Sequence, residues 1–154
     1  MAASKQKVSC STEIQASKER IWDVLTAPAT FEQWCAAFSP GSYFEGDWTE
    51  GSTMRFLAAN ESGNAAGMVT RVERHVPAEW LRLEHIGVVD NGLAVFEGEE
   101  YEKLIPAIEE YRLSEVPGGF RLSVETEVPD SYIAFFSQAW QDALNRIKAL
   151  AEGD

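Results

Sequence analysis

The sequence predicts an α+β domain in which a curved, seven-stranded antiparallel sheet wraps around a long C-terminal helix. Three observations support this fold class. Seven segments alternate apolar and polar residues with the period of two that a half-buried strand requires. Two short amphipathic segments follow the first strand, and one long amphipathic segment ends the chain. The strands follow one another through short connections, which favours an antiparallel meander with one face covered by the helix.

The first elements are two short helices that follow an edge strand. Residues 7–15 alternate as a strand, and Ser17 stands where a helix N-cap is needed. Pro28 ends the first helix and suits the first turn of the second. The second helix then repeats large apolar residues at helical spacing, which predicts a buried face made of Phe31, Trp34, Cys35 and Phe38.

The middle of the chain consists mainly of strand signals. Turn residues separate the segments, and Pro117-Gly118-Gly119 is a strong hairpin signal. In the last strand, alternate residues from Phe120 to Val128 are apolar or Thr, and the residues between them are polar, so one face of the sheet is exposed to water. The predicted strands after the first are residues 42–48, 53–59, 66–76, 79–88, 108–116 and 120–128.

The last helix has the clearest pattern in the sequence. It is expected to begin after Pro129, with Asp130 or Ser131 as its cap, and to end near Ala151. Phe135 projects away from the apolar stripe. At 100° per residue the stripe is narrow, and its members are Ile133, Phe136, Trp140, Leu144, Ile147 and Ala151.

The segment from residue 89 to residue 106 is predicted to be a long loop with a helical turn near residues 99–104. A loop of this length is uncommon in a compact domain and often serves as a lid or a binding loop. The segment also carries a cluster of four acidic residues, which we interpret as exposed to solvent. We call it the acidic group, and its members are Glu97, Glu99, Glu100 and Glu102.

Length, composition and charge restrict the function. The 154 residues are 45% apolar and 25% charged, as in an ordinary globular domain. We expect one domain over residues 7–152, preceded by a disordered segment at residues 1–6. The net charge of -12 argues against nucleic-acid binding and against insertion into anionic membranes, because both need clustered Lys and Arg.

Several motifs together resemble a known superfamily. The string from Ile14 to Thr26, followed by Phe31-Glu-Gln-Trp34, resembles the opening of the SRPBCC (START-like, helix-grip) superfamily. Gly46–Gly51, Gly67–Val72 and the terminal helix add to this resemblance, which spans about residues 8–151. The pattern is similar to the branch named after the activator of heat shock protein 90 ATPase homologue 1. The resemblance implies the helix-grip fold.

A sheet that curves strongly around one helix leaves space between them, and that space is a natural ligand site. We therefore expect a small hydrophobic or amphipathic molecule to bind there, with the protein acting as a carrier, sensor or sequestering factor. The residues expected to contact it are Trp34, Phe56, Leu83, His85, Tyr111, Phe136, Ala139, Trp140 and Ala143.

Two other functions stay open. The wider superfamily includes aromatase/cyclases, and the resemblance would then make His85 and Tyr111 acid–base candidates, although a core histidine that is merely hydrogen-bonded is the more frequent case. His75, near a strand end, is expected to be exposed. The resemblance also raises the prospect of a co-chaperone-like partnership with a heat shock protein 90 ATPase.

The sequence contains no recognisable catalytic or metal-binding motif. A P-loop, a GxSxG elbow, an HExxH pair and a Rossmann fingerprint are all missing. We therefore predict no metal and no cofactor, and binding rather than catalysis. Cys10 and Cys35 have no metal-ligand spacing and are interpreted as two reduced core thiols of a cytoplasmic protein.

Overall fold

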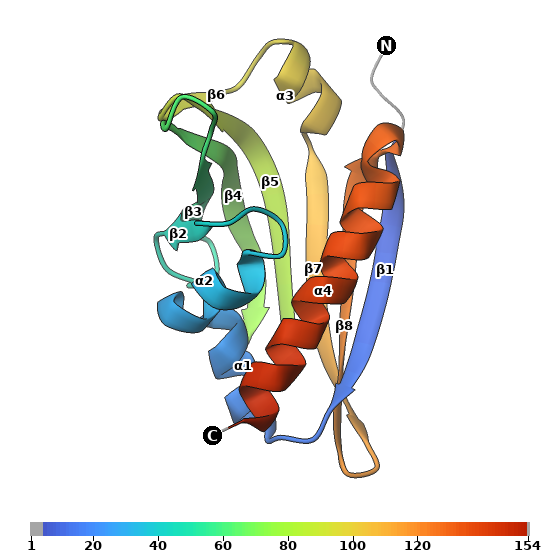
Figure 1. The fold of residues 1–154 in the computed structure, drawn as a ribbon. Coiled ribbons are helices and arrows are strands. Elements are labelled where there is room, and N and C mark those ends of the chain that lie inside the picture. The colour runs from blue at the N-terminus through green and yellow to red at the C-terminus, as the bar shows by residue number, and fades with distance from the viewer. Residues whose placement is uncertain (1–4, 154) are drawn as a thin grey trace.

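The structure, a computed structural model, describes residues 5–153 and confirms the α+β fold class. An antiparallel sheet curves around one long helix (Figure 1). The elements in chain order are β1 (Lys5–Ile14), α1 (Lys18–Thr26), α2 (Pro28–Cys35), β2 (Tyr43–Glu45), β3 (Thr53–Ala59), β4 (Ala65–Val76), β5 (Trp80–Asp90), β6 (Leu93–Val95), α3 (Glu99–Leu104), β7 (Ala107–Val116), β8 (Gly119–Pro129), a 3-10 turn (Asp130–Tyr132) and α4 (Ile133–Glu152).

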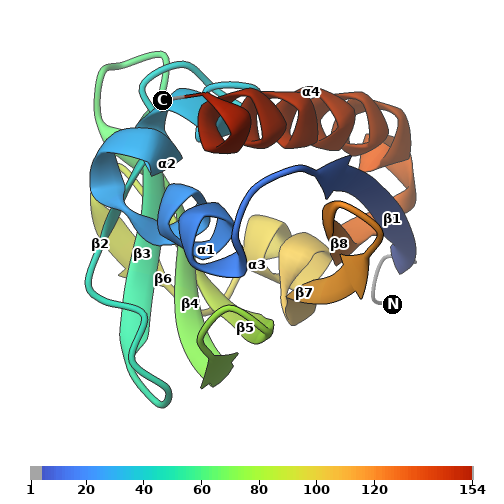
Figure 2. The same ribbon diagram turned by 90° about the horizontal axis from the view of Figure 1, so that it is seen from below.

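The strands form one sheet in the order β1-β8-β7-β5-β4-β3-β2, and every pairing is antiparallel. The first strand therefore pairs with the last, and β2 lies at the opposite edge. Seen along the sheet, the strands form a trough, and α4 lies across its open side with α1 and α2 beside it (Figure 2). This arrangement makes the concave face of the sheet the buried one.

The seven expected strands are all present, and their bounds agree closely with the predicted ranges. The largest difference is β2, which covers only Tyr43–Glu45 instead of residues 42–48. The alternation in β8 is also confirmed, since Leu122, Val124 and Val128 are all at most 3% exposed. Periodicity of two was sufficient to place these strands because most of the concave face of the sheet is buried against the helices.

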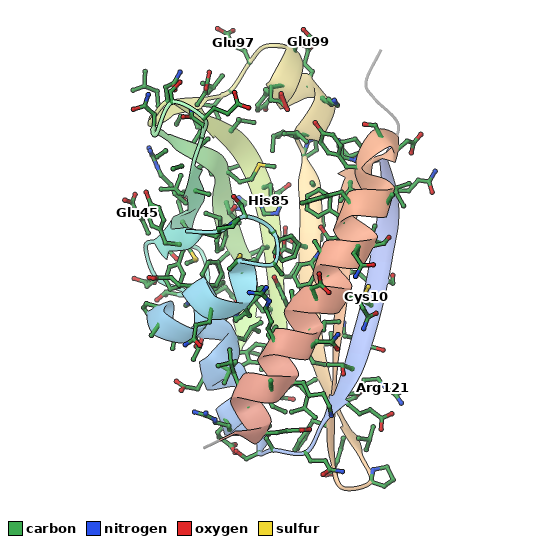
Figure 3. All side chains as sticks on the ribbon, in the orientation of Figure 1. Cys10, Glu45, His85, Glu97, Glu99 and Arg121 are labelled. Atoms are coloured by element: carbon green, nitrogen blue, oxygen red, sulfur yellow. The ribbon has the colours of Figure 1, made fainter. Side chains whose placement is uncertain are left out.

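The segment 89–106 is not the long loop that the sequence suggested. Val89 and Asp90 still belong to β5, and Leu93–Val95 form β6, an eighth strand that pairs with the end of β5. The expected helical turn is α3. Figure 3 shows Glu97 and Glu99 at the far end of the molecule beside α3, and the acidic group is exposed as expected.

The N-terminal strand begins earlier than predicted. Lys5 and Gln6 were expected to be disordered, but they pair with Pro129 and Val128 at the end of β8. The rest of the expected disordered segment, residues 1–4, lies outside the described residues. The partner strand β8 is long enough to extend the edge pairing to Lys5, which the alternation pattern alone could not show.

Helix α4 buries the stripe that its sequence predicted. Leu144 and Ile147 are fully buried against the sheet, whereas Phe135 is 55% exposed on the opposite side. The apolar side chains of α4, α1, α2 and the concave face of the sheet form one continuous core. Among the described helices, none is both long and apolar enough to cross a membrane.

Helix α1 begins with a side-chain cap, and helix α4 begins without one. Ser17 caps α1 as predicted, because its Oγ accepts a hydrogen bond from the Arg20 amide at 3.1 Å. The expected cap of the last helix is wrong. Asp130 and Ser131 lie in the 3-10 turn, and α4 begins at Ile133 without a side-chain cap. The turn tightens the entry into α4 and takes the place of a cap.

Replacing Ser17 by alanine is therefore expected to lower the free energy of unfolding by about 1 kcal/mol, because an amide of the first turn loses its acceptor. The same change at exposed Ser131 caps nothing and should stay within about 0.5 kcal/mol of the unchanged protein. Urea unfolding of both variants measures the difference. Equal losses in the two variants would contradict the cap assignment.

His75 is half-buried, which corrects the expectation that it is exposed. Its Nε2 accepts a hydrogen bond from the Trp22 indole N–H at 2.9 Å, and its Nδ1 lies 2.8 Å from the Trp48 carbonyl oxygen. The ring therefore connects β4 to α1 and to the segment before β3. Both ring nitrogens have partners within the protein, so His75 has a structural role.

Candidate ligand-binding cavity

A cavity of about 250 Å³ lies between the concave face of the sheet and the N-terminal half of α4. Its lining is mostly apolar and aromatic, which is typical of small-molecule sites. Residues from α2, the segment after it, α3, six strands and α4 contribute. The lining residues are Phe31, Trp34, Cys35, Phe38, Ser42, Tyr43, Phe56, Leu57, Ala58, Ala66, Gly67, Met68, His85, Leu104, Ala107, Glu109, Tyr111, Thr126, Glu127, Val128, Pro129, Phe136 and Trp140.

Aromatic rings form the wall on the helix side of the cavity. Trp140 of α4 packs edge-on against Phe38, with ring centroids 4.8 Å apart, and lies 6.1 Å from the ring of Trp34. Phe136, one helical turn before Trp140, is 6.0 Å from Phe38. These residues meet because α2, the segment after it and α4 all place aromatic rings toward the same space, with Phe136 and Trp140 one turn apart on α4.

The wall formed by the sheet carries a chain of hydrogen-bonded polar side chains. His85 of β5 lies near the middle of the molecule between the sheet and α4 (Figure 3). Its Nδ1 is 2.8 Å from the Thr70 hydroxyl, and its Nε2 is 3.2 Å from a Glu109 carboxylate oxygen. The Tyr111 hydroxyl donates to the other oxygen of Glu109. We call Thr70, His85, Glu109 and Tyr111 the polar array.

Strand pairing explains why these four residues meet. Thr70 on β4 stands directly opposite His85, and Ala107 on β7 stands opposite His85 on its other side. Glu109 and Tyr111 follow Ala107 at intervals of two, so they point to the same concave face. The array therefore crosses three neighbouring strands, which hold its members in fixed positions.

The hydrogen bonds also determine the form of the imidazole. A carboxylate only accepts hydrogen bonds, so His85 donates to Glu109 through Nε2–H. In the neutral imidazole, Nδ1 then accepts the proton of the Thr70 hydroxyl. Tyr111 also donates to Glu109. Each of these hydrogen bonds joins two members of the array, and Glu109 accepts two of them.

Burial raises the pKa of the Tyr111 hydroxyl well above its ordinary value, and the negative charge and hydrogen bond of Glu109 raise it further. The side chain is 3% exposed. Because the charged form of tyrosine is disfavoured in this position, Tyr111 keeps its proton and remains a donor throughout the neutral pH range.

Cys35 lies in the same lining, on the side of α2. Burial raises the pKa of its thiol to about 12, and the negative charge of Glu109 contributes to the rise. The thiolate is the reactive form of cysteine. Cys35 and Cys10 are both half-buried free thiols packed at the edge of the core, and not fully buried core residues as expected.

Alkylation measures this shift directly. Relative to a thiol of pKa 9.0, Cys35 in the folded protein should react with iodoacetamide about a thousandfold more slowly at pH 8, because each unit of pKa reduces the thiolate tenfold. Peptide mass spectrometry follows each cysteine, and the protein in urea serves as control, where both should react rapidly. Rapid labelling of Cys35 in the folded protein would contradict the prediction.

The residues predicted to contact a ligand fall into two groups. One group lines the cavity: Trp34, Phe56, His85, Tyr111, Phe136 and Trp140. The other group is buried outside the lining: Leu83, Ala139 and Ala143, with Ala139 4% exposed and the other two fully buried. The small alanines lie on the buried side of α4, where they allow close packing, and Leu83 lies in the core below the cavity.

Sequence reasoning missed Glu109, the centre of the polar array. The signal was present, because Glu109 is two residues before Tyr111 in a predicted strand, so the two side chains share one face of that strand. A carboxylate on the apolar face of a strand is costly to bury without partners. Such a residue is therefore informative, and it should have been considered together with His85.

A curved antiparallel sheet that encloses a long C-terminal helix and an apolar cavity defines a helix-grip protein. Comparison of the sequence with known protein families identifies the family. The chain belongs to the family described as Activator of Hsp90 ATPase homolog 1-like protein, which matches residues 15–152. The family resemblance seen in the sequence is thereby confirmed. A comparison with curated proteins gives no significant match.

Solved structures of low sequence identity share the fold. A protein from Mesorhizobium loti is 15% identical with a TM-score of 0.71, over 94% of this chain and 96% of that one. A protein from Chromobacterium violaceum is 22% identical with a TM-score of 0.69, over 96% and 99%. CalU16 from Micromonospora echinospora is 20% identical with a TM-score of 0.65, over 96% and 76%.

Proposed function

We propose that the protein binds a small, largely apolar molecule with one polar end, and that it acts as a carrier, sensor or sequestering protein. The observation that carries the proposal is the cavity of about 250 Å³, which has aromatic rings on one wall and the polar array on the other. The apolar body of the ligand would pack against Trp140 and Phe136. Its polar end would reach Glu109.

The arrangement fits the general design of a small-molecule site. Apolar lining supplies most of the affinity, and a few fixed polar groups orient the ligand. Here the polar groups come from paired strands, so they are in place before a ligand arrives and lose little freedom on binding. The aromatic wall comes from α2 and α4.

A cavity-filling variant tests the proposal. A set of two-ring aromatic compounds is titrated into the protein by calorimetry and by tryptophan fluorescence, since Trp34 and Trp140 line the cavity. Replacing Ala66, a lining residue, by leucine should weaken binding at least about tenfold, because the added side chain occupies the cavity. Ala149→Leu, on the exposed face of α4, is the matched control. Unchanged affinity in Ala66→Leu would overturn the proposal.

The polar array favours a second candidate function, acid–base catalysis on a carbonyl compound held in the same cavity. Glu109 would remove a proton from the carbon next to the carbonyl group, leaving an enolate. His85 would hold Glu109 in position through the Nε2–H hydrogen bond. General-base catalysis of this kind contributes about 10²–10⁴ in rate. This candidate corresponds to the cyclase-like alternative.

Deuterium exchange separates catalysis from binding. 2-Tetralone, a two-ring ketone, is incubated with the protein in D₂O, and exchange next to the carbonyl is followed by NMR. Catalysis predicts exchange about a hundredfold faster with the unchanged protein than with Glu109→Gln. Equal rates, with the ketone shown to bind, would reject catalysis and leave binding as the function.

A further inference from the structure

We infer that the ligand of this cavity is a hydrophobic amine, whose ammonium group is held by the Glu109 carboxylate. The inference rests on the proposed binding function and narrows it to one chemical class. It depends on two features of the lining: its charge, and the hydrogen bonds that the polar array leaves unused.

The charge of the lining is negative. Within residues 5–153, no lysine or arginine contributes to the lining, whereas Glu109 and Glu127 both do. The Glu127 carboxylate accepts a hydrogen bond from the Ile108 amide at 2.8 Å and alternates onto the water-facing side of β8, so Glu109 is the acid whose side chain faces the cavity. A ligand carboxylate or phosphate would therefore meet repulsion.

The hydrogen bonds of the array leave acceptors and no donors. Glu109 accepts from Tyr111 and His85, and a carboxylate has about four acceptor positions, so two remain free. The Thr70 proton is directed to His85. The hydroxyl of Ser42, another lining residue, donates to the Ser39 carbonyl at 2.6 Å. A ligand group that meets Glu109 must therefore supply the proton itself.

The indole nitrogen of Trp34 is a donor without a partner, but it does not change this conclusion. Its accessible surface is below 1 Å², so neighbouring atoms cover it even though the ring lines the cavity. A ligand in the cavity would contact the ring carbons of Trp34. The donor thus lies outside the reach of a ligand oxygen.

The charge of Glu109 acts across the cavity. It contributes to the raised pKa of both Tyr111 and Cys35, which line the cavity at different points. A partly buried carboxylate attracts a cation more strongly than a solvated one, because the effective dielectric constant is lower. The faces of the aromatic rings attract an ammonium group as well. An amine gains from both effects, and a neutral hydrocarbon gains from neither.

A matched series of naphthalene compounds tests the inference by calorimetry at pH 7. The series consists of 1-naphthylmethylamine, 1-naphthalenemethanol, 1-methylnaphthalene and 1-naphthoate, which share the same rings. We expect the amine to bind at least about tenfold more tightly than 1-methylnaphthalene, because a charge-assisted hydrogen bond is the strong kind. The alcohol should fall between them, and the naphthoate should bind most weakly.

The substitution Glu109→Gln removes the charge and keeps the shape. It should abolish the preference for the amine while 1-methylnaphthalene still binds, and Glu115→Gln, exposed on the same strand, should change neither. If the unchanged protein binds 1-methylnaphthalene or the naphthoate as tightly as the amine, the amine inference is wrong and the binding proposal stands. If it binds none of the four, the binding proposal itself fails. The series on the unchanged protein decides this even if the variant does not fold.

Discussion

Replacing Trp140 by alanine is expected to lower the free energy of unfolding by about 3–5 kcal/mol, the usual cost of truncating a large buried aromatic residue. The side chain is 3% exposed. It packs edge-on against Phe38 and Tyr111, with ring centroids 4.8 and 5.8 Å apart. Its removal would enlarge a cavity that already exists, so the neighbouring groups cannot recover the lost contacts by a small collapse. Urea unfolding followed by circular dichroism measures the loss.

Phe135 provides the control on the same helix. It lies in the first half of α4 like Trp140 but is 55% exposed, so Phe135→Ala should change stability by no more than about 0.5 kcal/mol. A loss below about 1 kcal/mol in Trp140→Ala would show that α4 is not held to the sheet at this point. Comparable losses of stability in Trp140→Ala and Phe135→Ala would also show that Trp140 does not hold α4 to the sheet.

Replacing Gly67 by alanine is expected to cost at least about 3 kcal/mol, because backbone strain and a steric overlap act together. Gly67 has φ of +155°, and a Cβ built there would lie 1.8 Å from the Phe56 carbonyl oxygen. Gly67 pairs with Leu57 across β3 and β4. A side chain would therefore push the two strands apart beside the cavity. Thermal unfolding measures the effect, with ligand binding as a second readout.

Gly63 separates the two causes. It also has a positive φ, +83°, but no atom lies within 4 Å of its ideal Cβ position. Gly63→Ala should therefore cost only the left-handed backbone penalty, about 1–2 kcal/mol. If the two glycine variants lost the same amount of stability, the close approach of β3 and β4 would not be what requires glycine at position 67.

Local patterns were sufficient to predict most of the fold. The strands and α4 were found because their burial repeats every two or every 3.6 residues, and the sequence carries both periods. The strand β6 was missed because Leu93–Val95 are too few to show a period, and they form a strand only through pairing with β5. His75 was misplaced for a similar reason, since its partners Trp22 and Trp48 are distant in sequence.

The cavity was harder to predict than the fold. His85 and Tyr111 were expected to contact a ligand, and the structure puts both in the lining. The same reasoning could not decide between a cavity and close packing next to Ala139 and Ala143, because small residues permit both. That choice depends on the angle and depth at which α4 lies on the sheet, and no local pattern encodes these.

Strand β5 pairs with two different strands along one edge, and this affects which substitutions and insertions the protein can accept. From Trp80 to His85 it pairs with β7, and from Val88 to Asp90 it pairs with β6, so the sheet branches directly after the histidine of the polar array. Insertions or exchanges within residues 91–106 would reshape one end of the cavity without shifting the β5–β7 register. The part of the lining that Leu104 supplies can therefore vary while the strands that carry the polar array keep their pairing.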